Sequence, residues 1–290
     1  MTKLIESKVY SIINDNFILR GGVDLLVGTT LVDWKTCSDI QEEIQKKDFS
    51  PQLDLYAAAL IDNGHEVTSY KYNLIKKPTK KLKQNQTPEE YVQELLDTYN
   101  TAPNQYAASY IMPITQERLE WAVNWMQDVC EDISRSRRLN RYPQNTSACK
   151  SFNTECKFLS LCSNQAHGRD IEHQMRMEYE TFNPGEREHG ELLMSYSSAI
   201  LYRLCARKFW YEHERRLRKK GIGDSLALTI GREFHEEIED VLHNGIDVAT
   251  KNFHMAIDLT EDRSEHQRHA QTYAMTLFAH SFFPEFAHEG

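Results

Sequence analysis

The stretch 20–56 constrains the fold of this chain more than any other part of the sequence. Two apolar runs, 23–27 and 30–32, stand on either side of Gly28 and a threonine, a pairing typical of a tight turn between strands. The pattern predicts a β-hairpin. Because a hairpin fixes which residues stand opposite each other, polar side chains at the two strand ends are brought together.

Each strand of this hairpin carries one carboxylate, Asp24 in the first and Asp33 in the second. Lys35 follows Asp33 by two positions, so strand alternation places both side chains on one face. Carboxylates are hard oxygen ligands for Mg²⁺ or Mn²⁺. Such a metal polarises a phosphate and activates water, while a lysine positions that water or stabilises phosphoryl charge. The pattern predicts metal-assisted phosphodiester hydrolysis; a hairpin with solvated charges is the alternative, since Asp-x-Lys alone is common.

Gln52 and Tyr56 lie four residues apart in a helix predicted over 51–62, so they share one face. Together with the hairpin motifs, this resembles the PD-(D/E)XK nucleases, specifically the RecB-like branch. The motifs of that branch read G-x-x-D, D-x-K and Q-x-x-x-Y in this order. The corresponding segments here are 21–24, 33–35 and 52–56.

The resemblance implies a metal-dependent deoxyribonuclease, an exonuclease acting on DNA ends or single strands in recombination, repair or phage DNA metabolism. It implies DNA as substrate, and a helicase or recombination protein as a partner. A non-catalytic module of the same fold, binding DNA or a partner protein, is the alternative. The residues implied as catalytic are Asp24, Asp33, Lys35, Gln52 and Tyr56.

The remaining patterns predict a mixed central sheet flanked by helices. We expect strands over 4–13, 16–27, 30–36, 67–75 and 106–114, a helix beginning after Thr87 and a long amphipathic helix from Thr115. Thr87 with Glu90 three residues later forms a capping box. The polar segment 37–50 is expected to be a loop beside the active site. The fold class is therefore α/β (α+β), with a restriction-endonuclease-like core and a helical C-terminal part.

The composition is that of a globular protein, with 40% hydrophobic and 27% charged residues. No apolar run approaches the ~20 residues of a membrane span, and the N-terminus lacks the apolar region of a signal peptide. We therefore expect a cytoplasmic protein without membrane contact. The net charge of −9 does not indicate nucleic-acid binding, but basic clusters occur at 76–83, 135–141 and 203–220. Such local basic patches can attract a polyanion such as DNA even when the net charge is negative. The alternative is that these clusters are ordinary solvated surface.

Three thiols, Cys149, Cys156 and Cys162, occur within fourteen residues. A gathering of this kind suits a soft metal or an iron–sulfur cluster, and Cys205 is a candidate fourth ligand. The arrangement resembles iron–sulfur RecB-like nucleases, including AddB-like and CRISPR-associated ones, which implies a 4Fe-4S cluster. Ala206 replaces the usual proline, and the first cysteine gap is longer than usual. Zinc is the alternative, because four thiolates also suit tetrahedral Zn²⁺. Cys37 and Cys130 stand alone and are expected to be ordinary residues.

The segment 195–242 resembles the N-terminal portion of a RecB-like domain, although here it follows the catalytic core. In the resembled family, the histidine of a G-x-x-x-H motif binds metal beside the carboxylates. The implied metal ligands are therefore Asp24, Asp33 and His235. Glu6 stands where this family often has a further acidic residue, with a solvated side chain as the alternative.

This order of segments predicts three parts: a nuclease core with the cysteine cluster over 1–162, a polar linker over 163–194 and a helical segment over 195–290. Two explanations of the order stay open. The halves assemble into one permuted domain, or the chain holds the back of one nuclease domain and the front of the next. In the second case core-facing apolar surface is exposed, which favours self-association of the two halves.

Overall fold

The computed structural model describes residues 3–151, 154–182, 192–221 and 225–286. The chain divides into two compact units. The core unit comprises Met1–Lys8, Gly22–Thr115 and Asp224–Gly290, and the cysteine unit comprises Val9–Gly21 and Gln116–Gly223.

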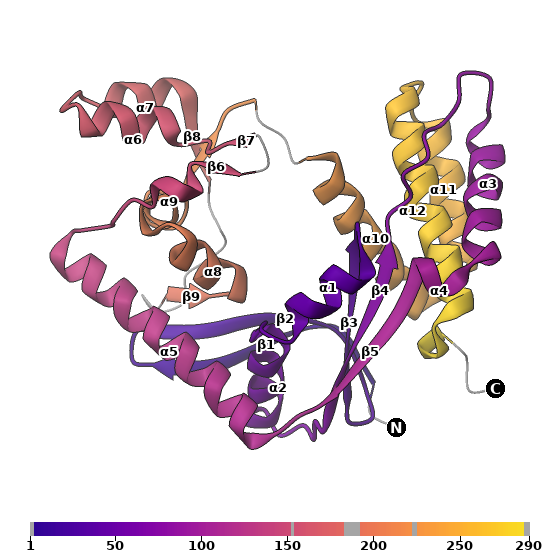
Figure 1. Cartoon of the computed structure of the whole chain (residues 1–290), viewed down its shortest axis with the longest axis horizontal. Helices are drawn as coiled ribbons and strands as arrows, with labels where there is room; N and C mark the ends of the chain where they lie inside the picture. The colour runs from indigo at the N-terminus through magenta and orange to yellow at the C-terminus, as the bar shows by residue number, and fades with distance from the viewer. Residues whose placement is uncertain (1–2, 152–153, 183–191, 222–224, 287–290) are drawn as a thin grey trace. The chain divides into compact units, whose positions relative to one another are not determined.

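The central sheet has the strand order β1-β2-β3-β4-β5, and the two N-terminal strands run through both units. β2 and β3 are antiparallel, β3 and β4 are parallel, and β4 and β5 are antiparallel (Figure 1). The short β9 pairs parallel with the start of β2. The strands are β1 Lys3–Asn14, β2 Phe17–Val27, β3 Thr30–Cys37, β4 Ser69–Lys76, β5 Ala107–Pro113 and β9 Leu192–Met194.

The turn between β2 and β3 sets the register of the catalytic hairpin. Gly28 has a φ of 59°, a left-handed conformation that glycine adopts at little cost. Leu25 stands opposite Val32, so Asp24 and Asp33 are the next residues along the two strands. The turn therefore fixes the proximity of the two carboxylates.

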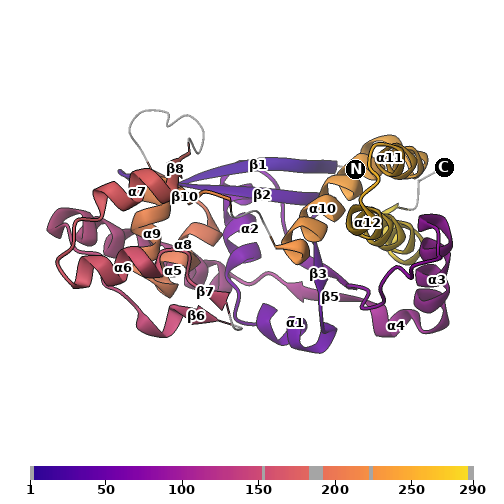
Figure 2. The ribbon, with the colours of Figure 1, turned by 90° about the horizontal axis from the view of Figure 1, so that it is seen from above.

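In the core unit, the C-terminal helices α10, α11 and α12 pack together, and α12 also packs against α3. Figure 2 shows α12 between α11 and α3. The capping box of α3 is formed, with Glu90 N donating to Thr87 Oγ1 and Thr87 N donating to Glu90 Oε2. The helices are α1 Ile40–Lys47, α2 Gln52–Asp62, α3 Pro88–Thr101, α4 Pro103–Tyr106, α10 Leu226–Asn244, α11 Asp247–Asp258, α12 Arg263–Phe282 and the 3₁₀ turn η3 Pro284–Phe286.

The C-terminal helices close the core on one side of the sheet. Phe234 of α10 is fully buried in one apolar cluster with Leu25 and Trp34 of the hairpin strands. α10 also comes close to β3, because a Cβ atom at Gly231 would lie 3.4 Å from Thr36 Oγ1. Burying a phenylalanine side chain is worth about 2–3 kcal/mol, so this contact contributes substantially to holding α10 on the sheet.

The last turn, η3, is joined to the sheet by a buried ion pair. Lys71 Nζ of β4 lies 2.5 Å from Glu285 Oε1, and Asn73 Nδ2 donates to the other carboxylate oxygen over 3.3 Å. Both partners of the ion pair are about nine-tenths buried. A buried charge that loses its partner is strongly destabilising, so this pair specifies where the C-terminal segment lies.

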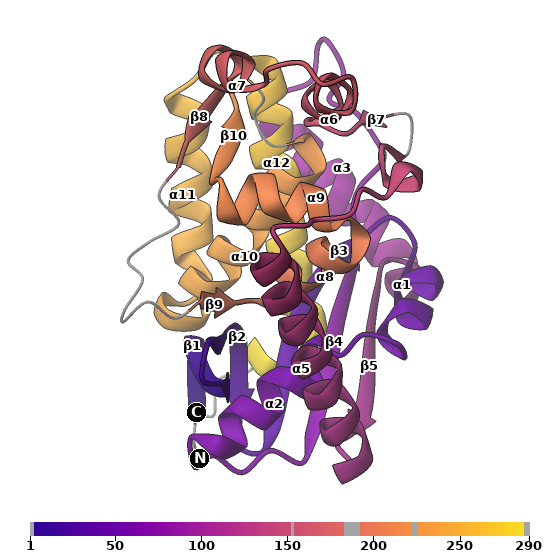
Figure 3. The same ribbon diagram turned by 90° about the vertical axis from the view of Figure 1, so that its left-hand side faces the viewer.

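The cysteine unit has a second apolar core, in which Phe158 stacks on Tyr211 and on Tyr179. Figure 3 shows β8 and β10 side by side, and these two strands are antiparallel. The elements are α5 Gln116–Leu139, η1 Thr146–Ala148, β6 Lys150–Ser151, β7 Thr154–Glu155, α6 Leu159–Ala166, α7 Glu172–Glu178, β8 Tyr179–Thr181, α8 Tyr196–Leu204, α9 Ala206–Phe209, the π-helical turn η2 Trp210–Glu214 and β10 Leu217–Lys219.

The mixed sheet, its flanking helices and the helical C-terminal part confirm the expected fold class. The expectation of a loop over 37–50 was wrong. Residues 40–47 form α1, because Asp39 caps the helix by accepting from Glu42 N and Lys46 and Lys47 pair with acidic residues one turn earlier. The three-part division stays a prediction; its 163–194 segment contains α7, β8 and β9, and residues 183–191 lie outside the described residues. None of the helices in the described ranges is long and apolar enough to cross a membrane.

Candidate active site

Asp24 projects from β2 into a buried part of the core unit. Its Oδ2 accepts a hydrogen bond of 2.9 Å from the backbone N–H of Trp34, which orients the carboxylate. Burial, together with the neighbouring charge of Asp33, raises the pKa of Asp24 well above its usual value. A carboxylate in this position is stabilised by an added cation.

Asp33 and Lys35 point to the same side of β3, as strand alternation predicts. Lys35 Nζ lies 2.7 Å from Asp33 Oδ1, while the buried Asp33 Oδ2 has no hydrogen-bond partner among the described residues. Burial alone would lower the pKa of Lys35, but the charges of Asp33 and Asp24 raise it above its usual value. Lys35 is therefore an ammonium group, and one oxygen of Asp33 is available for a ligand.

His235 reaches the same place from α10, more than 200 residues further along the chain. Its Nδ1 lies 3.4 Å from Asp24 Oδ2. Burial first, and then the charge of Lys35, lower the pKa of His235 to about 4. The ring is thus neutral at physiological pH, which is the form that binds metals through a nitrogen lone pair.

Glu6 of β1 completes a three-residue group. One ligand atom each from Glu6, Asp24 and His235 lies within 4.8 Å of the others, the only such group among the described residues. Glu6 has a φ of 41°, a left-handed conformation that is strained for a residue with a side chain. Burial, then the charges of Glu239 and Asp33, raise its pKa to about 7. From the sequence alone, Glu6 could be either a residue of the site or a solvated side chain. Its unusual φ could not be predicted from the sequence.

Gln52 and Tyr56 share a face of α2, as predicted from their spacing. Gln52 Nε2 lies 3.4 Å from Tyr56 Oη in a long hydrogen bond. Burial raises the pKa of Tyr56, and the charges of Lys35 and Asp33 also act on it, which puts the phenol in the electrostatic range of the hairpin motif. The two side chains therefore lie on the border of the site.

The donor set fits a hard divalent cation. Oxygen atoms of Glu6 and Asp24 and a neutral imidazole are grouped together, and the orphaned Oδ2 of the nearby Asp33 adds a further unused acceptor. Mg²⁺ and Mn²⁺ favour carboxylate oxygens, and Mn²⁺ also accepts imidazole. The three expected metal ligands, Asp24, Asp33 and His235, thus lie in one region together with Glu6. The group whose ligand atoms lie within 4.8 Å of one another contains Glu6 and not Asp33.

The four cysteines of the proposed second site all line one cavity of the cysteine unit. Burial, then the charge of Cys156, raise the pKa of Cys162 to about 11, and Asn145 N donates to Cys205 Sγ over 3.5 Å. No three of these sulfur atoms lie within 4.8 Å of one another. A single tetrahedral Zn²⁺ needs sulfurs roughly 4 Å apart, so this arrangement is not closed around one ion. Cys37 and Cys130 are buried elsewhere.

Comparison with protein families assigns this chain to a family. The family model of the PD-(D/E)XK nuclease superfamily matches residues 3–163, more than half of the chain. The matched range includes Glu6, Asp24, Asp33 and Lys35 and does not include His235. No curated protein and no solved structure matches the chain. The chain therefore belongs to the PD-(D/E)XK nuclease superfamily.

Proposed function

We propose that this protein is a Mg²⁺- or Mn²⁺-dependent deoxyribonuclease that hydrolyses phosphodiester bonds. Membership of the superfamily implies nuclease chemistry on DNA and the use of divalent metal ions. The observation that carries the proposal is the convergence of Glu6, Asp24 and His235 beside the Asp33–Lys35 pair. This set combines metal ligands with a fixed cation, as phosphoryl chemistry requires.

Asp24, Asp33 and His235 would hold the metal, and Glu6 is a further oxygen donor. When bound, a divalent ion polarises the phosphate and lowers the pKa of an attacking water. The Trp34 N–H orients Asp24. Burial keeps the His235 ring neutral, so His235 needs no deprotonation at neutral pH before it binds a metal.

Lys35 would act on the substrate and on the nucleophile. Its ammonium is held by Asp33 Oδ1, and its side chain is 25% exposed. An ammonium there stabilises charge developing on the phosphoryl oxygens or orients the attacking water. Gln52 and Tyr56 would support the site or contact the DNA backbone, because the charge of Lys35 acts on the Tyr56 phenol and Gln52 is hydrogen-bonded to that phenol.

A finer assignment to the RecB-like exonucleases is supported by the order of the three motifs, including Q-x-x-x-Y on α2. We place the substrate among DNA ends and single strands, and the role in recombination, repair or phage DNA processing, with a helicase or recombination protein as partner. The position of α10 favours a permuted arrangement, because His235 meets Asp24 within one unit of one chain.

For the cysteine unit we propose a 4Fe-4S cluster held by the four cavity cysteines, with zinc as the alternative. Support comes from the cavity that all four cysteines line and from the cysteine pattern of the sequence, because iron–sulfur clusters are held by cysteine thiolates. Anaerobically purified protein should absorb broadly near ~400 nm. Cys205→Ser should abolish this band while Cys130→Ala, outside the cavity, keeps it. Colourless protein with stoichiometric zinc would replace the cluster by zinc.

The nuclease proposal is tested with labelled single-stranded DNA in Mn²⁺. Asp33→Asn and Lys35→Met should each lower the cleavage rate by at least a factor of about 100, as loss of a charge-stabilising group does. Asp258→Asn and Lys251→Met on the exposed side of α11 are matched controls and should cleave like the natural protein. Circular dichroism checks that all four variants are folded.

A non-catalytic module that binds DNA is the rival, and the same assay separates the two. Retention of DNA without any cleavage in Mn²⁺ or Mg²⁺ would favour the rival. Cleavage that survives in Asp33→Asn and Lys35→Met would remove this site from the reaction.

A further inference from the structure

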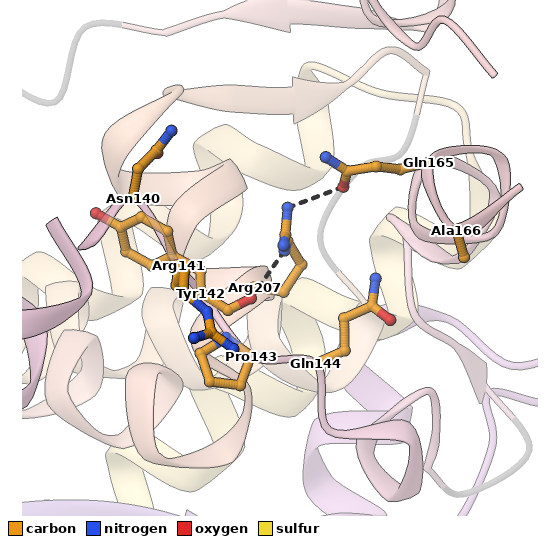
Figure 4. Close-up of a pocket in the computed structure, with 8 residues that line it drawn as sticks. All are labelled: Asn140, Arg141, Tyr142, Pro143, Gln144, Gln165, Ala166 and Arg207. Carbon is orange, nitrogen blue, oxygen red and sulfur yellow. Dashed lines mark hydrogen bonds between the residues drawn. The ribbon is translucent and has the colours of Figure 1, made fainter. Parts of the chain in front are cut away.

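The cysteine unit contains a second cavity that the nuclease site does not use. Its volume is about 460 Å³, within the range of small-molecule sites. It lies between the residues that follow α5, the end of α6, and α9 (Figure 4). The lining residues are Asn140, Arg141, Tyr142, Pro143, Gln144, Gln165, Ala166 and Arg207.

Arg207 is held in place at the centre of this cavity. Its Nε donates to the Tyr142 carbonyl oxygen over 2.9 Å, and its Nη1 donates to Gln165 Oε1 over 2.8 Å (Figure 4). Its guanidinium also stands 5.2 Å from the centre of the Trp210 ring. Two of five N–H donors are used in these bonds, so the fixed group keeps donors for an anion.

The rest of the lining is polar and cationic. Arg141 is exposed and carries a second guanidinium, while Asn140 and Gln144 are exposed amides. None of the described lining residues is acidic. Amides offer both donors and acceptors, as base edges require, and the two arginines suit phosphate. The cavity therefore offers arginines for an anionic group of a ligand and amide side chains for a heterocycle of the same ligand.

The charge of the whole unit agrees with an anionic ligand. By sequence, the cysteine unit holds 19 lysines and arginines against 16 aspartates and glutamates, a net charge of +3. The core unit holds 15 against 27, a net charge of −12. The modest net charge of the complete chain therefore conceals a cationic part, to which polyanions are drawn.

We propose that this cavity binds one nucleotide of single-stranded DNA, with the phosphate on Arg141 and Arg207 and the base among the amide side chains. The inference deepens the proposed function by adding a substrate-binding position outside the metal site. A single strand is favoured because its bases are free to enter a concave site, whereas those of a duplex are covered by pairing and stacking.

The test uses the full chain with Asp33→Asn, so that substrate persists, and fluorescence anisotropy with a labelled oligothymidylate in metal-free buffer. Arg141→Gln should weaken binding about tenfold and reduce the salt slope by about 0.7. Arg138→Gln changes an exposed arginine in the last turn of α5, three residues before Arg141 and outside the lining; it is the matched control and should change binding less than twofold. An oligonucleotide with abasic positions should bind more weakly than the intact strand, and Gln144→Ala should narrow that difference.

Equal losses for Arg141→Gln and Arg138→Gln would overturn the cavity as a site and leave a diffuse basic surface. Equal affinity for intact and abasic strands, or for single strand and duplex, would mean contact with phosphate alone and would also overturn it. Failure of the nuclease proposal is seen separately, as absence of cleavage by the chain with Asp33 restored. Arg141-dependent binding without cleavage would keep the cavity and remove the nuclease.

Discussion

Phe234→Ala tests the structural step on which the metal site depends, the packing of α10 on the hairpin strands. The ring is fully buried in one cluster with Leu25 and Trp34. Phe→Ala in such a core costs about 3–5 kcal/mol, because both transfer energy and cavity formation contribute. We expect a loss in the middle of this range, since sheet and helices enclose the ring and limit collapse.

Urea denaturation measures this loss. With a slope of about 2–3 kcal/mol per molar urea, the transition midpoint of the core unit should fall by more than about 1 M. Phe158→Ala removes an equally buried ring from the cysteine unit and is the matched control. It should also lose stability, but only Phe234→Ala should disturb the neighbouring His235.

His235 provides the specific readout. Burial and Lys35 lower its pKa to about 4 in the natural protein. When α10 packs loosely, the ring gains water and its pKa should return toward ~6.5, which NMR titration records. A loss below about 1 kcal/mol, or an unchanged His235 pKa in a destabilised Phe234→Ala protein, would refute the packing described here.

Two further predictions concern stability. Burial raises the pKa of Glu237 to about 8, so the folded state holds its proton more tightly than the unfolded state, and the free energy of unfolding should fall as pH rises from about 4.5 to about 8. Glu237→Gln should flatten this fall by about 3–4 kcal/mol between urea titrations at pH 5 and pH 8, and an unchanged slope would show that another group causes it. Thr87→Ala removes the capping-box acceptor of α3 and should cost about 1 kcal/mol, whereas Thr87→Ser should keep most of it; equal loss in both would contradict the cap.

Local patterns predicted the parts of the fold that depend on neighbouring residues. The hairpin followed from two apolar runs around Gly28, and the α3 start followed from Thr87 and Glu90. α1 was missed because it is short and largely polar, so its pattern resembled a loop. Its cap at Asp39 and its i,i+4 pairs supply what apolar periodicity does not.

The long-range parts of the site could not be derived from spacing. Only the family resemblance linked His235 to Asp24, because no local rule relates residues more than 200 positions apart. Glu6 has a left-handed backbone conformation within a strand, and nothing about a glutamate residue predicts that conformation. The cavity around Arg207 likewise arises from three separate segments.

The active site is assembled at an energetic cost that the rest of the core unit offsets. Burial and repulsion by neighbouring carboxylates, Asp33 in both cases, raise the pKa values of Asp24 and Glu6, so their negative charges are unfavourable where they stand. The packing of Phe234 and the buried Lys71–Glu285 pair hold the strands and the C-terminal helices together against this repulsion. A divalent cation would relieve the repulsion only in the folded state, so metal binding and stability of the core unit are linked. The same arrangement of charges that weakens the empty site is therefore what gives it affinity for metal.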